Sequence, residues 1–252
     1  MRTYTEGSLS TSRGYHIPTL SWIQEDDREI LLCVRGFGGG AYSTVVEKIA
    51  LEMKPCKIGT FSFTWPAHGN SDASGDMLTV ENCLADMEDA VSHLKSLYPD
   101  RKLSCFATSF GGFMTAVYHQ KHPEEFEKII LRSPAVRMAD IIMHFMNEEQ
   151  RAAYLAGEKL NFGFGDNPLI LGRDYYESLL RYPVFQTQLR QPDKFSIIQG
   201  DADEIVLPAD VRDYAARNKI PVFWAEGADH QYTNPGGLDA VLTFTKQIMT
   251  GA

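Results

Sequence analysis

The sequence predicts an α/β fold with a mostly parallel central sheet and helices on both faces of that sheet. Short apolar runs typical of buried strands alternate along the chain with segments whose apolar residues recur at helical spacing. Several of the apolar runs are continuous, as in residues 30–34, which is typical of strands covered on both faces. Strands and helices that alternate in this way favour right-handed crossovers and parallel strand neighbours.

The predicted elements follow this alternation in order. The chain opens with a polar β-hairpin, and helices are predicted up to Pro55, from a Thr79 cap to just before Pro99, directly after Ser109, from Pro208 onward, and at the C-terminus. The predicted strands are residues 4–9 and 15–23 of the hairpin, followed by 30–34, 58–63, 103–108, 129–131, 195–199 and 221–225.

The alternation fails between residues 134 and 185, where Met, Phe and Tyr are frequent. We expect a single α/β domain spanning residues 1–252, with this stretch inserted as a lid. Loops at the carboxyl ends of the strands are where an open α/β sheet binds its ligand, which favours a lid at that edge. The alternative is a set of helices that completes the core.

Composition and charge exclude several classes of function. The chain is 44% hydrophobic and 23% charged, and it has no apolar run near the roughly 20 residues that a membrane helix needs. Its N-terminus lacks the apolar core of a signal peptide, so we expect a cytoplasmic protein that does not bind membranes. A net charge of −9 disfavours nucleic acid as a partner. No spacing of the cysteines and histidines suggests a zinc site, so we expect no metal and no cofactor. The sequence leaves a homodimer open.

One serine has the setting of an activated nucleophile. The apolar run 103–108 breaks at Ser109, and a helical pattern starts directly after it. A serine on such a sharp strand-to-helix turn is strained, and its hydroxyl projects above the sheet, so its neighbours must be small. Ala107, Gly111 and Gly112 meet this need, although Ala107 stands where the usual pattern has Gly. We therefore predict Ser109 as the nucleophile.

An acid and a histidine follow at the ends of later predicted strands. A serine hydroxyl needs a base that takes its proton, and an acid must hold the imidazole of that base in the right tautomer. His230, in a Gly-Ala-Asp-His loop after the last strand, is the predicted base. Asp203 is the predicted acid, with Asp201 and Glu204 as alternatives. Serine, acid and histidine come in the chain order of an α/β hydrolase.

A glycine-rich loop follows the strand 30–34. Acyl transfer places negative charge on the carbonyl oxygen, and two backbone N–H groups normally stabilise that charge. We predict the N–H groups of Phe37, in this loop, and of Phe110, next to the nucleophile, as the two donors. Arg35 is expected either to bind substrate or to anchor the loop.

Aromatic residues are the candidates for the substrate pocket. They would suit an aryl or medium-length acyl group, and they would serve equally well in a plain core. His68, in the same loop as the first of them, is predicted to be structural. The candidates are Trp65 after the strand 58–63, and Phe145, Tyr154, Phe162 and Phe164 in the predicted lid.

With these motifs the chain resembles the α/β-hydrolase superfamily along nearly its whole length, and within it the bacterial cinnamoyl and feruloyl esterase group. The resemblance implies an α/β-hydrolase fold with an inserted lid. The chain departs from the group at Arg35, at Ala107 and Thr108, and at Thr64, which concerns substrate identity because the serine, acid, base and oxyanion donors are all present. The residues that carry the resemblance are Gly36, Phe37, the turn 67–72, Tyr175, Tyr176, the stretch 182–185 and the loop 226–230.

These observations predict a metal-independent serine hydrolase that cleaves small carboxylic esters, with aryl or short to medium acyl groups, through an acyl-enzyme. An amidase, aminopeptidase, thioesterase or acyltransferase would use the same triad, since the fold does not separate these activities. Glu148, Glu149 or Asp166 would supply the acidic group that an aminopeptidase needs for its substrate amine. A binding protein on a hydrolase scaffold is the remaining alternative, because Ala107 and Thr108 alter the turn at the serine.

Overall fold

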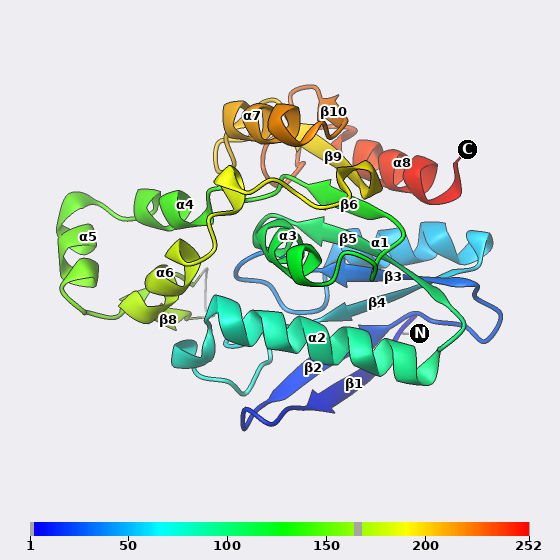
Figure 1. The fold of residues 1–252 in the computed structure, drawn as a ribbon, viewed down its shortest axis with the longest axis horizontal. Helices are drawn as coiled ribbons and strands as arrows, with labels where there is room; N and C mark the ends of the chain where they lie inside the picture. Colours follow the sequence, from blue (N-terminus) through cyan, green and yellow to red (C-terminus); the bar gives the residue numbers. More distant parts are fainter. Residues whose placement is uncertain (1–2, 164–167, 252) are drawn as a thin grey trace.

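An eight-stranded sheet forms the centre of the computed structural model, which describes residues 3–163 and 168–251 (Figure 1). The strands of this sheet are β1 (Thr5–Ser10), β2 (His16–Ser21), β3 (Glu29–Val34), β4 (Ile58–Phe63), β5 (Lys102–Thr108), β6 (Ile129–Arg132), β9 (Phe195–Gly200) and β10 (Val222–Ala225). Their order in the sheet is β1-β2-β4-β3-β5-β6-β9-β10. β2 is antiparallel to both β1 and β4, and the remaining neighbours are parallel. The predicted α/β class and mostly parallel sheet are confirmed.

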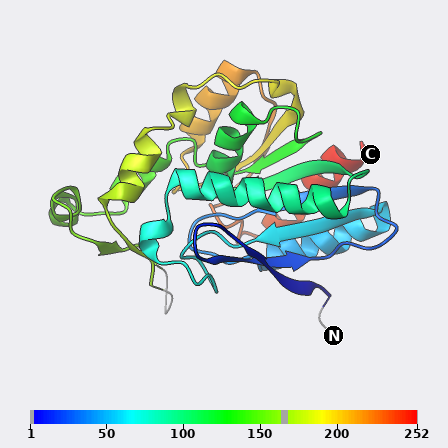
Figure 2. The same ribbon diagram turned by 60° about the horizontal axis from the view of Figure 1, so that its bottom comes forward.

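Helices cover both faces of the sheet. One face carries α1 (Thr44–Met53) and α8 (Gly237–Thr250), whose buried side chains form one apolar cluster with Leu31, Cys33 and other strand residues. The opposite face carries α2 (Val80–Leu97), α3 (Phe110–Lys121) and α7 (Pro208–Asn218), which share a second, larger cluster. Figure 2 shows these two layers with the sheet between them. In the part of the chain that the structure describes, none of the helices combines the length and the apolar character of a membrane span.

Local signals in the sequence set the ends of several helices. The hydroxyl of Ser43 accepts a hydrogen bond from Val46 N–H and starts α1, and Pro55 follows the end of that helix. Thr79 caps α2 as predicted, with its hydroxyl 3.2 Å from Asn82 N. Pro208 occupies the first turn of α7. N–H groups in a first turn have no acceptor within the helix, so the missing N–H of proline costs no hydrogen bond there.

Between β6 and β9 the chain leaves the sheet. This part contains α4 (Met138–His144), α5 (Glu148–Leu155), a small hairpin of β7 (Leu160–Asn161) and β8 (Ile170–Leu171), and α6 (Arg173–Leu180). Short 3₁₀ turns lie at Lys54–Cys56, Gly75–Met77, Val184–Gln186 and Pro192–Lys194. In Figure 1, α4, α5 and α6 lie together beyond one end of the sheet. We refer to residues 134–185 as the inserted segment.

Several contacts fix the inserted segment to the core. The buried hydroxyl of Ser178 in α6 accepts a hydrogen bond from Val80 N–H, in the first turn of α2, at 3.1 Å. Arg181 pairs with Glu81 through two N–H···O contacts of 2.9 and 3.0 Å. A Cβ atom at Gly75 would lie 1.8 Å from the carbonyl oxygen of Ile170, so β8 passes directly against that glycine. The segment therefore packs on the first turn of α2 and on the 3₁₀ turn that precedes this helix.

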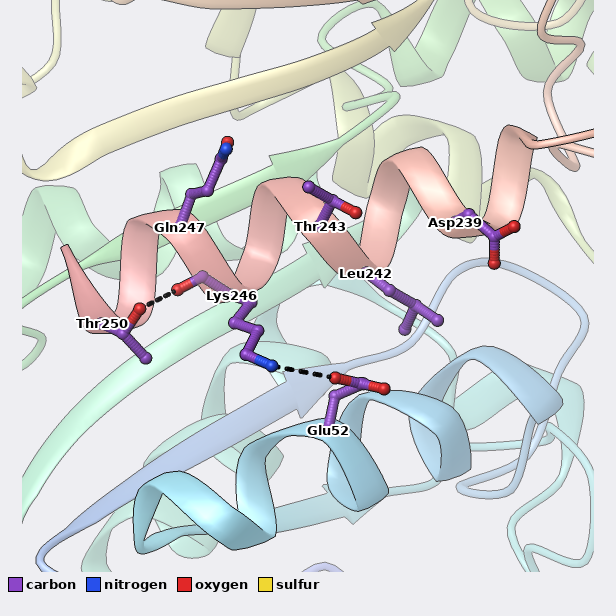
Figure 3. Close-up of a pocket in the computed structure, with 7 residues that line it drawn as sticks. All are labelled: Glu52, Asp239, Leu242, Thr243, Lys246, Gln247 and Thr250. Atoms are coloured by element: carbon purple, nitrogen blue, oxygen red, sulfur yellow. Dashed lines mark hydrogen bonds and ion pairs between the residues drawn. The ribbon is translucent and has the colours of Figure 1, made fainter. Parts of the chain in front are cut away.

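A surface pocket of about 460 Å³ lies between α1 and α8 (Figure 3). The ammonium of Lys246 on α8 lies 3.3 Å from a carboxylate oxygen of Glu52 on α1, which links the two helices. The remaining lining residues of the pocket also lie on α8. None of the loops at the carboxyl ends of the strands contributes to it.

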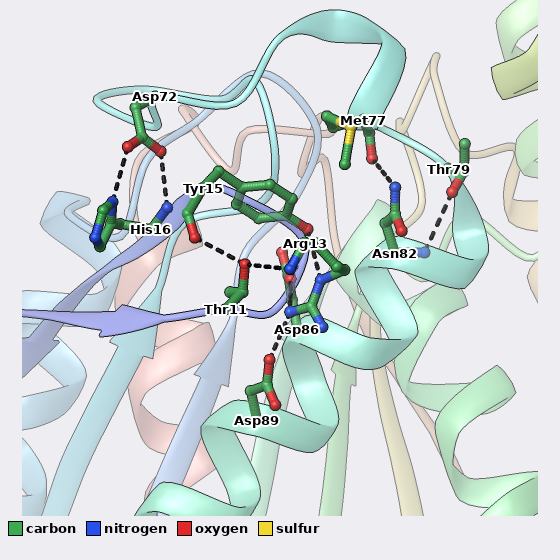
Figure 4. A network of polar contacts seen from close by, with 10 residues as sticks. All are labelled: Thr11, Arg13, Tyr15, His16, Asp72, Met77, Thr79, Asn82, Asp86 and Asp89. Carbon is green, nitrogen blue, oxygen red and sulfur yellow. Dashed lines mark hydrogen bonds and ion pairs between the residues drawn. The ribbon is translucent and has the colours of Figure 1, made fainter.

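The N-terminal hairpin is tied to α2 by a polar network (Figure 4). The guanidinium of Arg13 pairs with both Asp86 and Asp89, and the hydroxyl of Tyr15 donates to Asp86 at 2.7 Å. Asp86 is fully buried, and this burial raises the pKa of its carboxyl to about 6, although Tyr15 and Arg13 oppose the shift. The hairpin is therefore held by a carboxylate with an unusually high pKa.

Candidate active site

Ser109 lies on the turn between β5 and α3. Its backbone has φ 52° and ψ −116°, a strained conformation that residues other than glycine rarely adopt. The turn is held by the bond from Ser109 N–H to the carbonyl of Arg132, at 3.0 Å. A Cβ atom at Gly111 would lie 2.5 Å from the carbonyl oxygen of Val34, so α3 approaches the end of β3 more closely than any other residue would allow. The small residues of this stretch therefore permit the turn.

The structure brings Ser109, His230 and Asp203 together. Nε2 of His230 lies 3.2 Å from the hydroxyl oxygen of Ser109, and Nδ1 lies 2.9 and 3.1 Å from the two carboxylate oxygens of Asp203. A carboxylate only accepts at neutral pH, so Nδ1 carries the proton and Nε2 faces the serine as an acceptor. This is the arrangement in which an imidazole takes a proton from a hydroxyl.

Asp203 is held firmly as the partner of the imidazole. Its carboxylate accepts hydrogen bonds from Ile205 N–H, Val206 N–H and the side-chain amide of Gln199, at 2.8 to 3.0 Å. Burial alone would raise the pKa of Asp203, but the hydrogen bond from His230 and the bond from Val206 N–H hold it below the ordinary value. Asp203 is therefore ionised at neutral pH.

Neither of the two alternative acids, Asp201 and Glu204, pairs with the imidazole, and Glu204 is exposed. The carboxylate of Asp201 accepts from Gly227 N–H and supports the loop that carries His230. Asp229, next to the histidine, accepts from Thr233 N–H at 2.8 Å and also pairs with the Thr233 hydroxyl. Neither contacts the imidazole, which leaves Asp203 as its acidic partner.

The two predicted oxyanion donors lie beside Ser109. Phe110 is the first residue of α3, and the first N–H groups of a helix have no acceptor within it. The loop with Phe37 lies against the turn, because a Cβ atom at Gly36 would be 3.3 Å from the Cβ of Ser109. The rings of Phe37 and Phe110 are 6.1 Å apart, and Tyr175 from α6 packs against both. The inserted segment therefore contacts both residues.

Arg35 makes the contacts of a loop anchor. Its guanidinium donates to the carbonyl of Gly40 at 2.9 Å and to the hydroxyl of Ser43 at 2.8 Å. Burial lowers the pKa of Arg35 to about 10, and the positive charge of Arg132 adds to this shift. Of the two roles expected for Arg35, its contacts match the anchor and not the substrate-binding residue.

The predicted pocket aromatics mostly have packing roles. Trp65 has no exposed surface, and its indole N–H donates to the carbonyl of Arg35 at 2.7 Å. Tyr154 is also fully buried, and it packs against Phe162 with the ring centroids 5.5 Å apart. Phe145 is 45% exposed at the end of α4. Trp65, Tyr154 and Phe162 therefore offer a substrate almost no surface, because their rings are buried against other parts of the chain.

Two further predicted residues, Phe164 and Asp166, lie outside the described residues. Glu148 and Glu149, the other candidates for an amine-binding group, are exposed in the first turn of α5. Neither of them has a contact with the triad, so the structure does not single them out.

A cavity of about 300 Å³ lies beside the glycine-rich loop, with Gly38, His68 and Leu169 among its lining residues. His68 is buried, and Nδ1 lies 2.8 Å from the carbonyl of Pro66, which only accepts, so Nδ1 carries the proton. Burial lowers the pKa of His68 to about 4, so its imidazole is neutral at physiological pH. These contacts fit its expected structural role.

Within the described part of the chain, no cluster of His, Cys, Asp or Glu has the geometry to hold a metal ion.

Sequence reasoning missed Arg132. This residue ends β6, its carbonyl accepts from Ser109 N–H, and its guanidinium donates to the carbonyl of His230 at 3.2 Å. The only signal in the sequence was a charged residue directly after the apolar run 129–131. The structure shows that this side chain is 96% buried, which is rare for an arginine.

Solved structures with this fold span almost the whole chain. A protein from Agrobacterium vitis S4 described as a hydrolase superposes with a TM-score of 0.83 at 17% identity, over 98% of this chain and 99% of that chain. Est1E from Butyrivibrio proteoclasticus, solved with ferulic acid bound, gives 0.79 at 16% identity, over 97% and 98%. Alpha/beta hydrolase domain-containing protein 10 from mouse gives 0.79 at 12%, over 98% and 99%. These likenesses show the α/β-hydrolase fold.

Comparison by sequence gives the family. A search of curated proteins found no significant match. The family model Hydrolase_4, described as serine aminopeptidase, S33, matches residues 25–162, which is more than half of the chain. This match covers the glycine-rich loop and the turn at Ser109, the two motifs that form one half of the site. The chain therefore belongs to the Hydrolase_4 family of α/β hydrolases.

Proposed function

We propose that this protein is a serine hydrolase that cleaves small carboxylic esters through an acyl-enzyme. One observation carries the proposal: the hydroxyl of Ser109, the imidazole of His230 and the carboxylate of Asp203 form a continuous chain of contacts of 2.9 to 3.2 Å on a strained turn. Strain of this kind is retained where surrounding structure enforces it, and it is frequent at reactive serines.

The residues divide the chemistry as follows. Ser109 attacks the carbonyl carbon while His230 takes its proton, and the carboxylate of Asp203 stabilises the imidazolium that forms. The N–H groups of Phe37 and Phe110 stabilise the oxyanion, and each such donor typically contributes about 10²–10³ in rate. His230 then gives its proton to the leaving alcohol. Water, activated by the same imidazole, releases the acid and restores Ser109.

The test is the intact mass of the protein after treatment with a fluorophosphonate. We expect a single adduct on the wild-type chain, and no adduct on Ser109→Ala or His230→Ala. An adduct that persists in Ser109→Ala would refute the assignment of the nucleophile. No adduct on well-folded wild-type protein would favour a binding protein on a hydrolase scaffold.

The matched family model also favours a second candidate, an aminopeptidase on the same triad. Both activities need the same nucleophile, base and oxyanion donors, and they differ in the leaving group and in recognition of the substrate amine. Turnover of an aryl ester should be compared with that of the matching aminoacyl anilide. We expect the ester to be preferred, and preference for the anilide would assign the aminopeptidase activity.

A further inference from the structure

Arg132 is a buried cation that the triad chemistry does not use. It lies at the end of β6, between β5 and β9, paired in register with Thr108 on one side and Ile198 on the other. Side chains alternate along a strand, so Arg132 points to the same face as Ile130, which belongs to the cluster beneath α1 and α8. A charge at such a place costs free energy unless nearby groups compensate for it.

The compensating groups of Arg132 belong to the loops of the active site. Nη2 donates to the carbonyl of His230 at 3.2 Å, and the guanidinium lies over the ring of Tyr232, 4.5 Å from its centroid. Burial lowers the pKa of Arg132, while Tyr232, Asp203 and Asp229 oppose the shift. A guanidinium keeps its charge in proteins, so Arg132 is a cation. The side chain of Arg132 thus packs against the loop that carries the catalytic histidine.

The backbone of the same residue holds the nucleophile. Ser109 N–H donates to the carbonyl of Arg132 at 3.0 Å, so the strained turn rests on the end of β6. Ser109 and His230 are also linked by the reactive contact itself, at 3.2 Å. Arg132 therefore connects the two residues by a second route, which does not pass through the atoms that react.

We propose that Arg132 is a positioning residue that sets the distance between the base and the nucleophile by bonding to the backbone of both. The inference rests on the proposed function of Ser109 and His230. A displacement of about 1 Å in a catalytic group can reduce the rate by about 10²-fold, so loss of this link acts on the chemical step. Substrate binding is affected less, because the Arg132 side chain is 96% buried and offers almost no surface to a bound molecule.

The experiment compares Arg132→Met, Arg132→Lys and the wild type on an aryl ester, with the melting temperature measured for each. A methionine side chain is nearly as long as that of arginine but has no charge and no hydrogen-bond donor. A lysine side chain keeps the positive charge and a donor but lacks the planar guanidinium group. We expect kcat to decrease in the order wild type, Arg132→Lys, Arg132→Met, by about 10–100-fold in the last, with KM changed by less than about twofold. If Arg132→Met does not fold, Arg132→Lys carries the test.

Arg13→Met is the matched control, since it removes a partly buried arginine with several partners, on the hairpin at the β1 edge of the sheet. We expect it to lower the melting temperature and leave kcat unchanged. The proposal is overturned if a folded Arg132 variant keeps the wild-type kcat, or if its loss of activity equals its loss of folded protein.

A second readout does not depend on turnover. The proton on Nδ1 of His230, which faces Asp203, should give a protected NMR signal in the wild type and in Arg13→Met. We expect this signal to be lost or broadened by exchange in both Arg132 variants, and an unchanged signal would overturn the proposal. If the wild type is not labelled by a fluorophosphonate, the proposed function fails, and the NMR signal still decides whether Arg132 positions His230.

Discussion

Nε2 of His230 lies 3.2 Å from the hydroxyl of Ser109, although 121 positions separate the two residues in the sequence. The turn after β5 presents the serine and the loop after β10 returns the histidine to the same edge of the sheet. Parallel strands bring their carboxyl ends to one edge, so the topology makes this meeting possible.

Asp203→Asn should abolish most activity without unfolding the chain. The amide cannot accept the Nδ1 proton in the same way and favours the wrong tautomer of His230, so we expect kcat to fall by a factor on the order of 10⁴. Steady-state kinetics on an aryl ester measures the loss. Asp201→Asn is the control, because Asp201 contacts only the backbone of the histidine loop. Equal losses in the two variants would contradict the assignment of the acid.

Gly111→Ala should disturb both stability and activity. The new methyl group would lie 2.5 and 2.6 Å from the carbonyl oxygens of Val34 and Arg35, so α3 must move away from β3. We expect a loss of about 1–3 kcal/mol in the free energy of unfolding, measured by urea denaturation, and a lower rate of fluorophosphonate labelling at Ser109. Gly172→Ala is the control, since its methyl group would meet the Lys159 side chain at an ordinary 3.6 Å.

Asp86 should make stability depend on pH in the direction opposite to most carboxylates. Its pKa is raised from 3.8 to about 6 in the folded protein, so the folded state binds the proton more tightly than the unfolded state. The contribution of this group is then fully present below pH 3.8 and is lost as the pH rises through about 6. We expect the stability of the wild type relative to Asp86→Asn to be greater at pH 4 than at pH 7. Urea denaturation at pH 4 and pH 7 measures the free energy of unfolding of both proteins. If the wild type instead gains stability relative to Asp86→Asn as the pH rises, the raised pKa is refuted.

Ser178→Ala should loosen the contact between α6 and α2. The variant leaves the buried Val80 N–H without its acceptor, which typically costs about 1–3 kcal/mol in the free energy of unfolding. Urea denaturation of the variant checks this. Ser96→Ala is the control, because Ser96 is exposed and bonds only within its own helix. A loss no larger than that of Ser96→Ala would show that the contact contributes little.

Much of the fold could be predicted because its signals are local. The apolar run 58–63 coincides with β4, and the Thr79 cap and Pro208 begin the helices where the sequence predicts. Chain order also brought the triad into view, since strand, turn and helix around Ser109 have a recognisable pattern.

The functions of the aromatic residues could not be predicted, because a pocket and a core use the same residue types. Trp65 and Tyr154 became core residues through contacts with chain segments that are distant in sequence. Arg132 was missed for the same reason: its meaning depends on β6 lying between β5 and β9, and on a loop almost a hundred residues later returning to it.

The bond between Ser178 and Val80 has a consequence for engineering. The inserted segment supplies an acceptor to the core helix α2, so it is not an independent module that can be exchanged between hydrolases at its two ends. A chimera that takes its insertion from a relative would need a hydroxyl at the equivalent of position 178, or a different first turn in α2. Compatibility between graft and scaffold, more than the shape of the graft, would then decide whether such chimeras fold.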